Sequence, residues 1–252
     1  YDVAIEGGKG VSVEKVNKAE SPNYLFVDVN IAPNAQPGTY YIVFSKDGQS
    51  FKYPYEIAAR EEGSAERKSF TTADMIYLIM PDRFANGDPS NDSVEGMPDK
   101  ADRSKPFGRH GGDIQGIIDH LDYISELGAT AIWCTPLIED NLEKTTYHGY
   151  ACTDYYHIDA RFGDNDLFRE YVQKAHEKDL KIIMDIVPNH AGSGHWWMED
   201  VPFKDWYHVF DTYTGSNIVF STNMDPNAST QDLYIQESGW FDTSMVDMNL
   251  DN

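Results

Sequence analysis

The segment that most constrains the fold is Lys181–His190, which reads KIIMDIVPNH. An apolar run of this kind, interrupted by Asp185, is typical of a strand buried on both faces within a parallel sheet. Pro188 cannot donate a hydrogen bond to a neighbouring strand, so we expect the strand to end there. Asp185, Asn189 and His190 would then lie at its carboxyl end, where parallel α/β folds bind ligands. A strand end whose Asp and His only satisfy loop backbone groups has the same pattern, so the segment by itself leaves both interpretations open.

The charge balance excludes several classes of partner. The 252 residues include 42 acids and 20 bases, which gives a formal net charge of −22. Nucleic acids and anionic membrane surfaces require basic patches, so neither is expected as a partner. No apolar run is long enough to cross a bilayer, and the chain does not open on a signal peptide, so we expect residue 1 to be either a processed end or an artificial boundary. Cys134 and Cys152 imply neither a disulfide framework nor a zinc site.

Residues 1–58 have the alternation of a small antiparallel β domain. The apolar runs Tyr40–Ser45 and Phe51–Ile57 flank the sequence Lys46-Asp47-Gly48-Gln49. An Asp-Gly pair between two alternating runs predicts a tight hairpin. The many aromatic residues of these strands could form a sugar-binding face or fill the core of a β-sandwich, and we favour the core. Residues 59–71 are charged, small and non-periodic, which predicts a linker.

Residues 72–190 alternate between strand and helix patterns. The expected elements are strands at Met75–Met80, Thr130–Cys134 and Lys181–Val187, and helices at 114–127 and Asp164–Lys178. This order predicts parallel strands joined by right-handed crossovers, as in α/β folds. Residues 191–252 are too many for an ordinary loop, so they are expected to form an excursion with structure of its own.

The loop after the first of these strands collects oxygen-bearing side chains. Asn86, Asp88, Asn91 and Asp92 fall within seven residues, around Gly87. Calcium takes six to eight oxygen ligands, and alternating Asn and Asp residues are how a short loop supplies them. The loop lacks the bidentate Glu of an EF-hand, and a solvated turn is the alternative interpretation.

Two motifs give the chain from about residue 75 onward a family resemblance. Asp185, Val187, Asn189 and His190 match Asp-x-Val-x-Asn-His, the signature at the end of the third barrel strand in the α-amylase family of glycoside hydrolases. The sequence at Thr145–Asp159, TTYHGYACTDYYHID, is similar to the segment that follows the second barrel strand in that family. Within the family, the chain most resembles the neopullulanase and cyclomaltodextrinase type.

The resemblance assigns roles to five residues. It places Tyr150 under the sugar of the cleavage subsite, with His148 nearby, and an aromatic ring suits the apolar face of a pyranose. His190 is implied to hydrogen-bond the hydroxyls of the same sugar. Asp185 is implied to be structural and to orient the other groups of the site, and Asn189 to hold the insertion that follows.

The resemblance also extends to the acidic loop. The loop is similar to the calcium loop of cyclodextrin glycosyltransferases and neopullulanases, in which a later Gly carbonyl and Asp complete the site. The implied Ca²⁺ ligands are Asn86, Asp88, Asn91, Asp92, Gly111 and Asp113. Asp113 could also serve as the N-cap of the helix that begins at residue 114.

The implied fold class is α/β: a partial (β/α)8 TIM barrel preceded by a small β-sandwich domain. The expected divisions are a β-sandwich at 1–58, a linker at 59–71, barrel strands one to three at 72–190, and the insertion domain after strand three at 191–252. A complete barrel needs about 250 residues. The chain is therefore expected to be the N-terminal portion of a longer protein.

The implied activity is retaining hydrolysis of α-1,4-glucosidic bonds in starch, maltooligosaccharides, cyclodextrins or pullulan. Retention needs two carboxylates about 5–5.5 Å apart, which the family carries on barrel strands four and five. No Gly-x-Arg-x-Asp sequence occurs in the chain. We therefore assign no catalytic residue here and expect this chain by itself to be inactive.

Two alternatives remain open at this point. One is a non-catalytic α-glucan-binding protein on the same scaffold, and the other is a family member with glucanotransferase or isomerase activity. The expected partner in each case is an α-glucan oligosaccharide or polysaccharide. A homodimer through the N-terminal domain and a periplasmic or secreted location are further expectations.

Overall fold

The computed structural model describes residues 1–67, 69–209, 214–216, 222 and 224–250. The chain divides into two compact units, Tyr1–Lys68 with Pro202–Lys204 and Ser69–Val201 with Asp205–Asn252. Where the sequence predicts a linker, the described positions from 58 to 75 contain no helix or strand.

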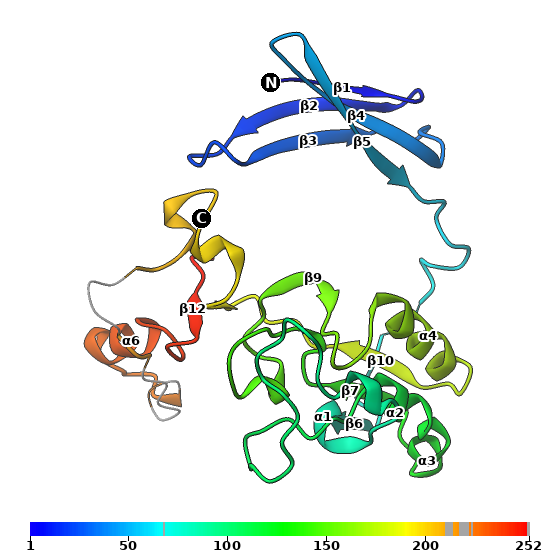
Figure 1. Cartoon of the computed structure of the whole chain (residues 1–252), viewed down its shortest axis with the longest axis vertical. Helices are drawn as coiled ribbons and strands as arrows, with labels where there is room; N and C mark the ends of the chain where they lie inside the picture. The colour runs from blue at the N-terminus through cyan, green and yellow to red at the C-terminus, as the bar shows by residue number, and fades with distance from the viewer. Residues whose placement is uncertain (68, 210–213, 217–221, 223, 251–252) are drawn as a thin grey trace. The chain divides into compact units, whose positions relative to one another are not determined.

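The described part of the first unit has two antiparallel sheets (Figure 1). Its strands are β1 (Asp2–Glu6), β2 (Val11–Lys18), β3 (Leu25–Ile31), β4 (Gly38–Lys46) and β5 (Gln49–Ile57). One sheet has the order β1-β4-β5, and the other pairs β2 with β3. The predicted hairpin is confirmed, because Lys46 pairs with Gln49. Asp47 and Gly48 between them have φ angles of 53° and 77°, the left-handed values that a tight turn of this kind requires.

The aromatic residues of β4 and β5 differ in burial. Tyr40 is 3% exposed, as predicted for a core residue. The same prediction is wrong for Phe51 and Tyr53, which are 62% and 53% exposed. β5 lies at the edge of its sheet and has β4 as its only neighbour in the described sheet, whereas Tyr40 lies on the central strand β4.

The second unit contains a three-stranded parallel sheet with the order β10-β7-β6. Its strands are β6 (Ile76–Ile79), β7 (Ala131–Cys134) and β10 (Lys181–Met184), at the predicted places. The connections carry α2 (Ile114–Ile118), α3 (Leu121–Glu126) and α4 (Asn165–His176). The α4 helix begins after Asp164, whose carboxylate accepts a 2.7 Å hydrogen bond from the Leu167 N–H. Closure into a barrel remains a prediction.

One face of this sheet is buried and the other is open. Ile79, Ile132 and Cys134 pack in the main core with residues of α2, α3 and α4. On the opposite face, Leu78 is 57% exposed and Trp133 is 37% exposed. The third strand is no more buried: its first three residues are partly exposed and Met184 is 41% exposed. The prediction that this strand is buried on both faces is therefore wrong within the described chain.

The predicted helix at 114–127 is interrupted. Between α2 and α3, His120 has φ −115° and ψ 14°, which are not helical values. Its Nδ1 lies 2.7 Å from the Gly116 carbonyl, which its own N–H would bond in a continuous helix. The His120 N–H bonds the Ile117 carbonyl at 3.0 Å instead. The ring thus competes with the backbone for an acceptor, which the apolar spacing could not reveal.

The remaining elements belong to loops around the sheet and to the insertion. They are α1 (Pro81–Phe84), β8 (Ile138–Glu139), β9 (Asp154–Ile158), β11 (His190–Gly192), α6 (Thr230–Glu237) and β12 (Met245–Asp247). β11 pairs with β12, and a small core around Ala191, Tyr207 and Val246 supports the pair. Of the predicted insertion domain, residues 210–213, 217–221, 223 and 251–252 lie outside the described residues. No helix in the described chain has the length and apolar character needed to cross a membrane.

Candidate active site

Asp185 connects two aromatic residues at the carboxyl end of the parallel sheet. It directly follows β10, and its Oδ2 accepts hydrogen bonds from Tyr150 Oη at 3.2 Å and from Trp133 Nε1 at 3.0 Å. Burial raises the pKa of the Tyr150 phenol, and the neighbouring Asp185 carboxylate raises it further. The phenol is therefore a hydrogen-bond donor at neutral pH, and the ring of Tyr150 is held in a defined orientation.

His148 lies beside Tyr150 at the end of a short 3₁₀ turn, Thr146–His148. The Tyr150 N–H donates to His148 Nδ1 at 2.9 Å, and the two ring centroids are 5.7 Å apart. Burial lowers the pKa of His148, and the neighbouring His190 also lowers it. With Nδ1 accepting from the backbone, the neutral ring carries its proton on Nε2. His148 can thus offer a neutral N–H donor to a ligand.

His190 is buried against the same loop. Its Nε2 lies 2.9 Å from the Tyr150 carbonyl, and its ring stacks on Phe241 at a centroid distance of 6.1 Å. Asn189 donates to Asp247 Oδ1 at 3.1 Å, and its carbonyl accepts from the Met248 N–H at 2.9 Å. Asn189 therefore binds the strand end to the β12 segment.

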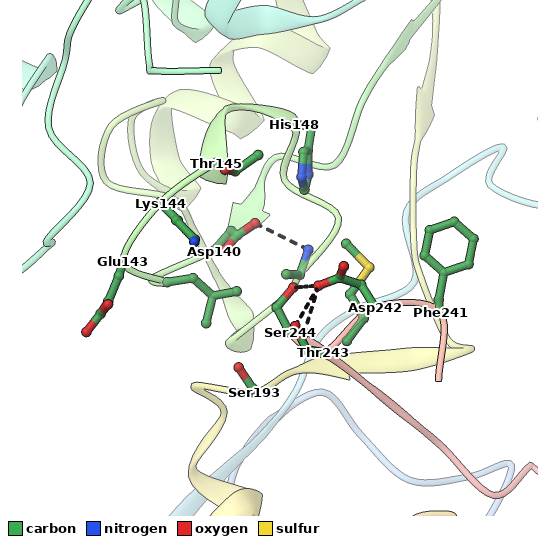
Figure 2. A pocket seen from close by; sticks show the side chains of 13 residues that line it. Asp140, Glu143, Lys144, Thr145, His148, Ser193, Phe241, Asp242, Thr243 and Ser244 are labelled. Carbon is green, nitrogen blue, oxygen red and sulfur yellow. Dashed lines mark hydrogen bonds between the residues drawn. The ribbon is translucent and has the colours of Figure 1, made fainter. Parts of the chain in front are cut away.

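A cavity of about 570 Å³ opens next to His148 (Figure 2). Hydroxyl, carboxylate and ammonium groups line it together with the ring of Phe241. Asp140 forms part of its wall and is buried; its Oδ2 accepts from the Ala151 N–H at 3.2 Å, while Oδ1 has no partner among the described atoms. Burial raises the pKa of Asp140 to about 7. A mixed polar and aromatic lining of this kind suits a carbohydrate.

Sequence reasoning missed three residues of this region: Trp133, Asp140 and Phe241. Trp133 lies on the predicted second strand, and its place on the open face could have been read from the two-residue period. Asp140 and Phe241 lie in segments with no periodic pattern. Asp140 and Phe241 line the same cavity only because of how residues 191–252 fold after β10, and no local sequence pattern predicts that.

The cavity wall is supported by a buried ion pair between Asp159, the last residue of the Thr145–Asp159 motif, and Arg161, which lies outside that motif. Arg161 donates to both carboxylate oxygens of Asp159, at 2.9 Å and 2.7 Å, and both side chains are fully buried. Its remaining hydrogen bonds go to the carbonyls of Asp99 and Asp140, at 3.0 Å and 2.6 Å. The pair therefore fixes the segments on both sides of the cavity wall.

The predicted calcium ligands meet only in part. The Asp113 carboxylate caps α2 through the Gly116 N–H at 2.6 Å and accepts from the Gly87 and Asp88 N–H groups at 3.0 Å and 2.8 Å. Asp88 is turned toward Ser90, whose hydroxyl donates to its Oδ1 at 2.6 Å. Both candidate roles of Asp113 were foreseen, and the structure shows the capping role.

The other members of the set lie close together. Asn86 Nδ2 donates to Asp92 Oδ1 at 2.6 Å, while Asn86 Oδ1 and Asn91 Oδ1 are buried and have no partner among the described atoms. Gly111 has φ of 85°, and a Cβ at this position would lie 2.4 Å from Asp92 Oδ1. No group of three or more His, Cys, Asp or Glu residues in the described chain is arranged to hold a metal. A cation here would therefore need amide and carbonyl oxygens in addition to any carboxylate.

Comparison with known proteins places the chain in a family. The α-amylase catalytic domain family matches residues 78–250, and the family described as cyclomaltodextrinase, N-terminal, matches residues 1–61. The chain therefore belongs to the α-amylase catalytic domain family, preceded by an N-terminal domain of the cyclomaltodextrinase type.

Two curated relatives illustrate the similarity. The chain is 42% identical over 147 residues to neopullulanase 2 from Thermoactinomyces vulgaris, covering 54% of this chain and 24% of the relative. It is 40% identical over 170 residues to a cyclomaltodextrinase from Thermoanaerobacter pseudethanolicus, covering 64% of this chain and 28% of the relative. The chain thus spans about a quarter of the length of these two relatives.

Two solved structures are similar in fold. The crystal structure of an Anoxybacillus α-amylase has a TM-score of 0.56 and 41% identity, and that of an α-amylase from Geobacillus thermoleovorans complexed with acarbose has 0.53 and 34%. In both cases the similarity covers 71% of this chain and 34% of the other.

Proposed function

We propose that this chain belongs to a glycoside hydrolase that cleaves α-1,4-glucosidic bonds in starch, maltooligosaccharides, cyclodextrins or pullulan. The observation that carries the proposal is the Tyr150 ring, oriented by Asp185 at the carboxyl end of β10 beside His148 and His190. An aromatic face flanked by the neutral N–H donor of His148 suits a glucose ring. The names of the two curated relatives support the same class of substrate.

The proposed mechanism is retaining, through a covalent glycosyl-enzyme intermediate, and it needs a carboxylate nucleophile and a carboxylic acid. The chain contains no Gly-x-Arg-x-Asp sequence. We therefore assign both groups to polypeptide outside this chain, and assign to this chain one wall of the substrate cleft. Asp185 acts there as a positioning residue for Tyr150.

The proposal includes a Ca²⁺ site in the Asn86–Asp92 loop. It is supported by the buried, unpartnered Oδ1 atoms of Asn86 and Asn91, which lie in the same loop as Asp92, and by Gly111 of the later segment, which lies against Asp92 and Asn86. These are hard oxygen ligands of the kind that calcium prefers. Bound calcium would hold the loop after β6 against the start of α2. Its role would be structural, because neither asparagine contacts the Tyr150 region.

The deciding experiment uses the native protein in its full length. It is incubated with maltoheptaose, cyclodextrin and pullulan, and the anomeric form of the first product is followed by NMR. Release of α-anomeric maltooligosaccharides supports a retaining hydrolase, and β-anomers contradict retention. Binding without turnover would instead indicate a glucan-binding protein, and products longer than the substrate would indicate a glucanotransferase.

A further inference from the structure

A second cavity adjoins the one beside His148. It has a volume of about 640 Å³ and lies between the 98–108 loop and the segment Glu143–Thr145. The same three residues, Glu143 to Thr145, also line the first cavity. This short segment is therefore a ridge shared by the two cavities, and a chain-like ligand that fills the first can continue across it into the second.

The second cavity carries an exposed aromatic ring on a fixed loop. Phe107 lines this cavity and is 67% exposed, so its ring is accessible to a ligand that enters the cavity. The loop on either side is held by Arg83, which donates to the carbonyls of Pro106 at 3.0 Å and of Gly108 at 2.8 Å. The Arg83 guanidinium in turn lies over the Tyr147 ring, 4.3 Å from its centroid. The backbone that carries Phe107 is thus positioned before any ligand arrives.

The charges around this cavity cancel, which narrows the class of ligand. Among its described lining residues, the three bases are Lys100, Lys105 and Lys144, and the three acids are Asp99, Asp102 and Glu143. Most of these groups already have partners. Lys105 pairs with Asp102 at 3.0 Å, Lys100 donates to the Val94 carbonyl, and Asp99 accepts from the Thr146 N–H at 3.0 Å and hydroxyl at 2.9 Å. A neutral polar wall with one aromatic ring suits an uncharged polyol and disfavours a phosphate or a carboxylate ligand.

We propose that Phe107 forms an outer binding subsite for linear α-glucan chains, in which a pyranose ring stacks its C–H face on the exposed phenyl ring. This inference rests on the proposed function, since it extends the same substrate away from Tyr150. The subsite distinguishes long chains from short ones: a glucan too short to cross the Glu143–Thr145 ridge gains nothing from Phe107. It therefore determines chain-length preference and leaves the bond specificity at the inner site unchanged.

The test compares thio-linked analogues of maltotriose and maltoheptaose, which a glycosidase binds without hydrolysing, by isothermal titration calorimetry on the full-length protein. Phe107→Ala should weaken maltoheptaose binding about five- to tenfold, as expected for one aromatic stack, and leave maltotriose binding unchanged. Phe107→Trp should keep the preference for maltoheptaose, because the indole ring also offers an aromatic face for stacking. Tyr123→Ala is the matched control: Tyr123 is half exposed on α3 and is not among the described residues lining either cavity. It should leave both affinities at the wild-type value.

The outcomes separate this inference from the proposed function. If the wild-type protein binds both sugars and Phe107→Ala binds maltoheptaose as tightly, or loses affinity for both sugars equally, the outer subsite is refuted and the proposed function stands. If the wild-type protein binds neither sugar, both proposals are refuted together.

Discussion

The phenol of Tyr150 and the carboxylate of Asp185, which are 35 positions apart in the chain, are joined by a 3.2 Å hydrogen bond. The same carboxylate oxygen accepts a 3.0 Å bond from the indole of Trp133 on β7. One acidic residue past the end of β10 therefore connects the neighbouring strand and the loop that carries the candidate sugar-stacking ring. This makes Asp185 a positioning residue, with an effect on ligand binding that passes through Tyr150.

Substitutions at Tyr150 should separate the contribution of its aromatic ring to sugar binding from that of its hydrogen bond to Asp185. Tyr150→Phe keeps the aromatic face and removes the hydrogen bond to Asp185, so maltotriose binding should weaken about two- to tenfold, the range of a single hydrogen bond. Tyr150→Ala also removes the stacking surface and should weaken binding further. Calorimetric titration of the full-length protein with thio-linked maltotriose, which a glycosidase binds without hydrolysing, measures both. Tyr123→Phe is the matched control on α3, and equal losses for Tyr150→Phe and Tyr150→Ala would contradict a stacking role.

Calcium should stabilise the loop after β6. A ligand at 100 times its dissociation constant stabilises the folded state by about 2.7 kcal/mol, and for a chain of this size that raises the melting temperature by roughly 5–10 °C. EGTA should remove this shift and added CaCl₂ should restore it, as followed by thermal denaturation. The reason is that Ca²⁺ gives the buried Oδ1 atoms of Asn86 and Asn91 a partner.

Asn86→Ala and Asn91→Ala should each abolish most of the calcium-dependent shift. Ser90→Ala is the control within the same loop, because the Ser90 hydroxyl bonds Asp88 and neither of the two asparagine oxygens. If calcium raises the melting temperature of Asn86→Ala as much as that of wild type, the two asparagine oxygens are not calcium ligands.

Elements whose signals are local could be predicted from the sequence. The Asp47-Gly48 turn follows from backbone sterics, and the start of α4 follows from the Asp164 cap. The exposure of Phe51 could not be predicted, since it depends on the place of β5 at the edge of its sheet, which the local sequence does not indicate. The break at His120 could not be predicted either, because it arises from a side chain that takes a backbone acceptor.

The residues of the candidate site also fall into two groups, those that a sequence pattern predicts and those that depend on tertiary contacts. Tyr150, Asp185 and His190 were identified because their spacing resembles a family motif, and the structure brings them together. Asp140 and Phe107 carry no motif. Asp140 is notable because it is buried, and Phe107 because it is exposed. Both properties depend on contacts between segments far apart in the sequence.

The buried ion pair below the cavity should be essential for stability. Arg161→Met leaves the Asp159 carboxylate buried without its partner, so the free energy of unfolding should fall by about 3–5 kcal/mol. Urea denaturation measures the loss. Arg169→Met is the matched control, because Arg169 pairs with Asp166 at the surface of α4, where such pairs contribute less than about 1 kcal/mol. Similar losses in the two variants would contradict the importance of burial.

Asp140 should make stability fall as the pH rises. Its pKa in the folded protein is about 7 because of burial, against about 3.9 in an unfolded chain. The folded state therefore holds this proton more tightly, and ionisation costs stability between about pH 4 and pH 7. The Asp140→Asn variant has no carboxyl to ionise here. The difference in unfolding free energy between this variant and wild type should therefore shift in favour of the variant by a few kcal/mol from pH 5 to pH 8, as measured by urea denaturation. Asp242→Asn is the control and should show no change relative to wild type between pH 5 and pH 8, because hydrogen bonds from Ser244 lower the pKa of Asp242 and its carboxyl is already ionised at pH 5 in both the folded and the unfolded state. Parallel pH profiles for wild type and Asp140→Asn would show that the buried carboxyl titrates normally.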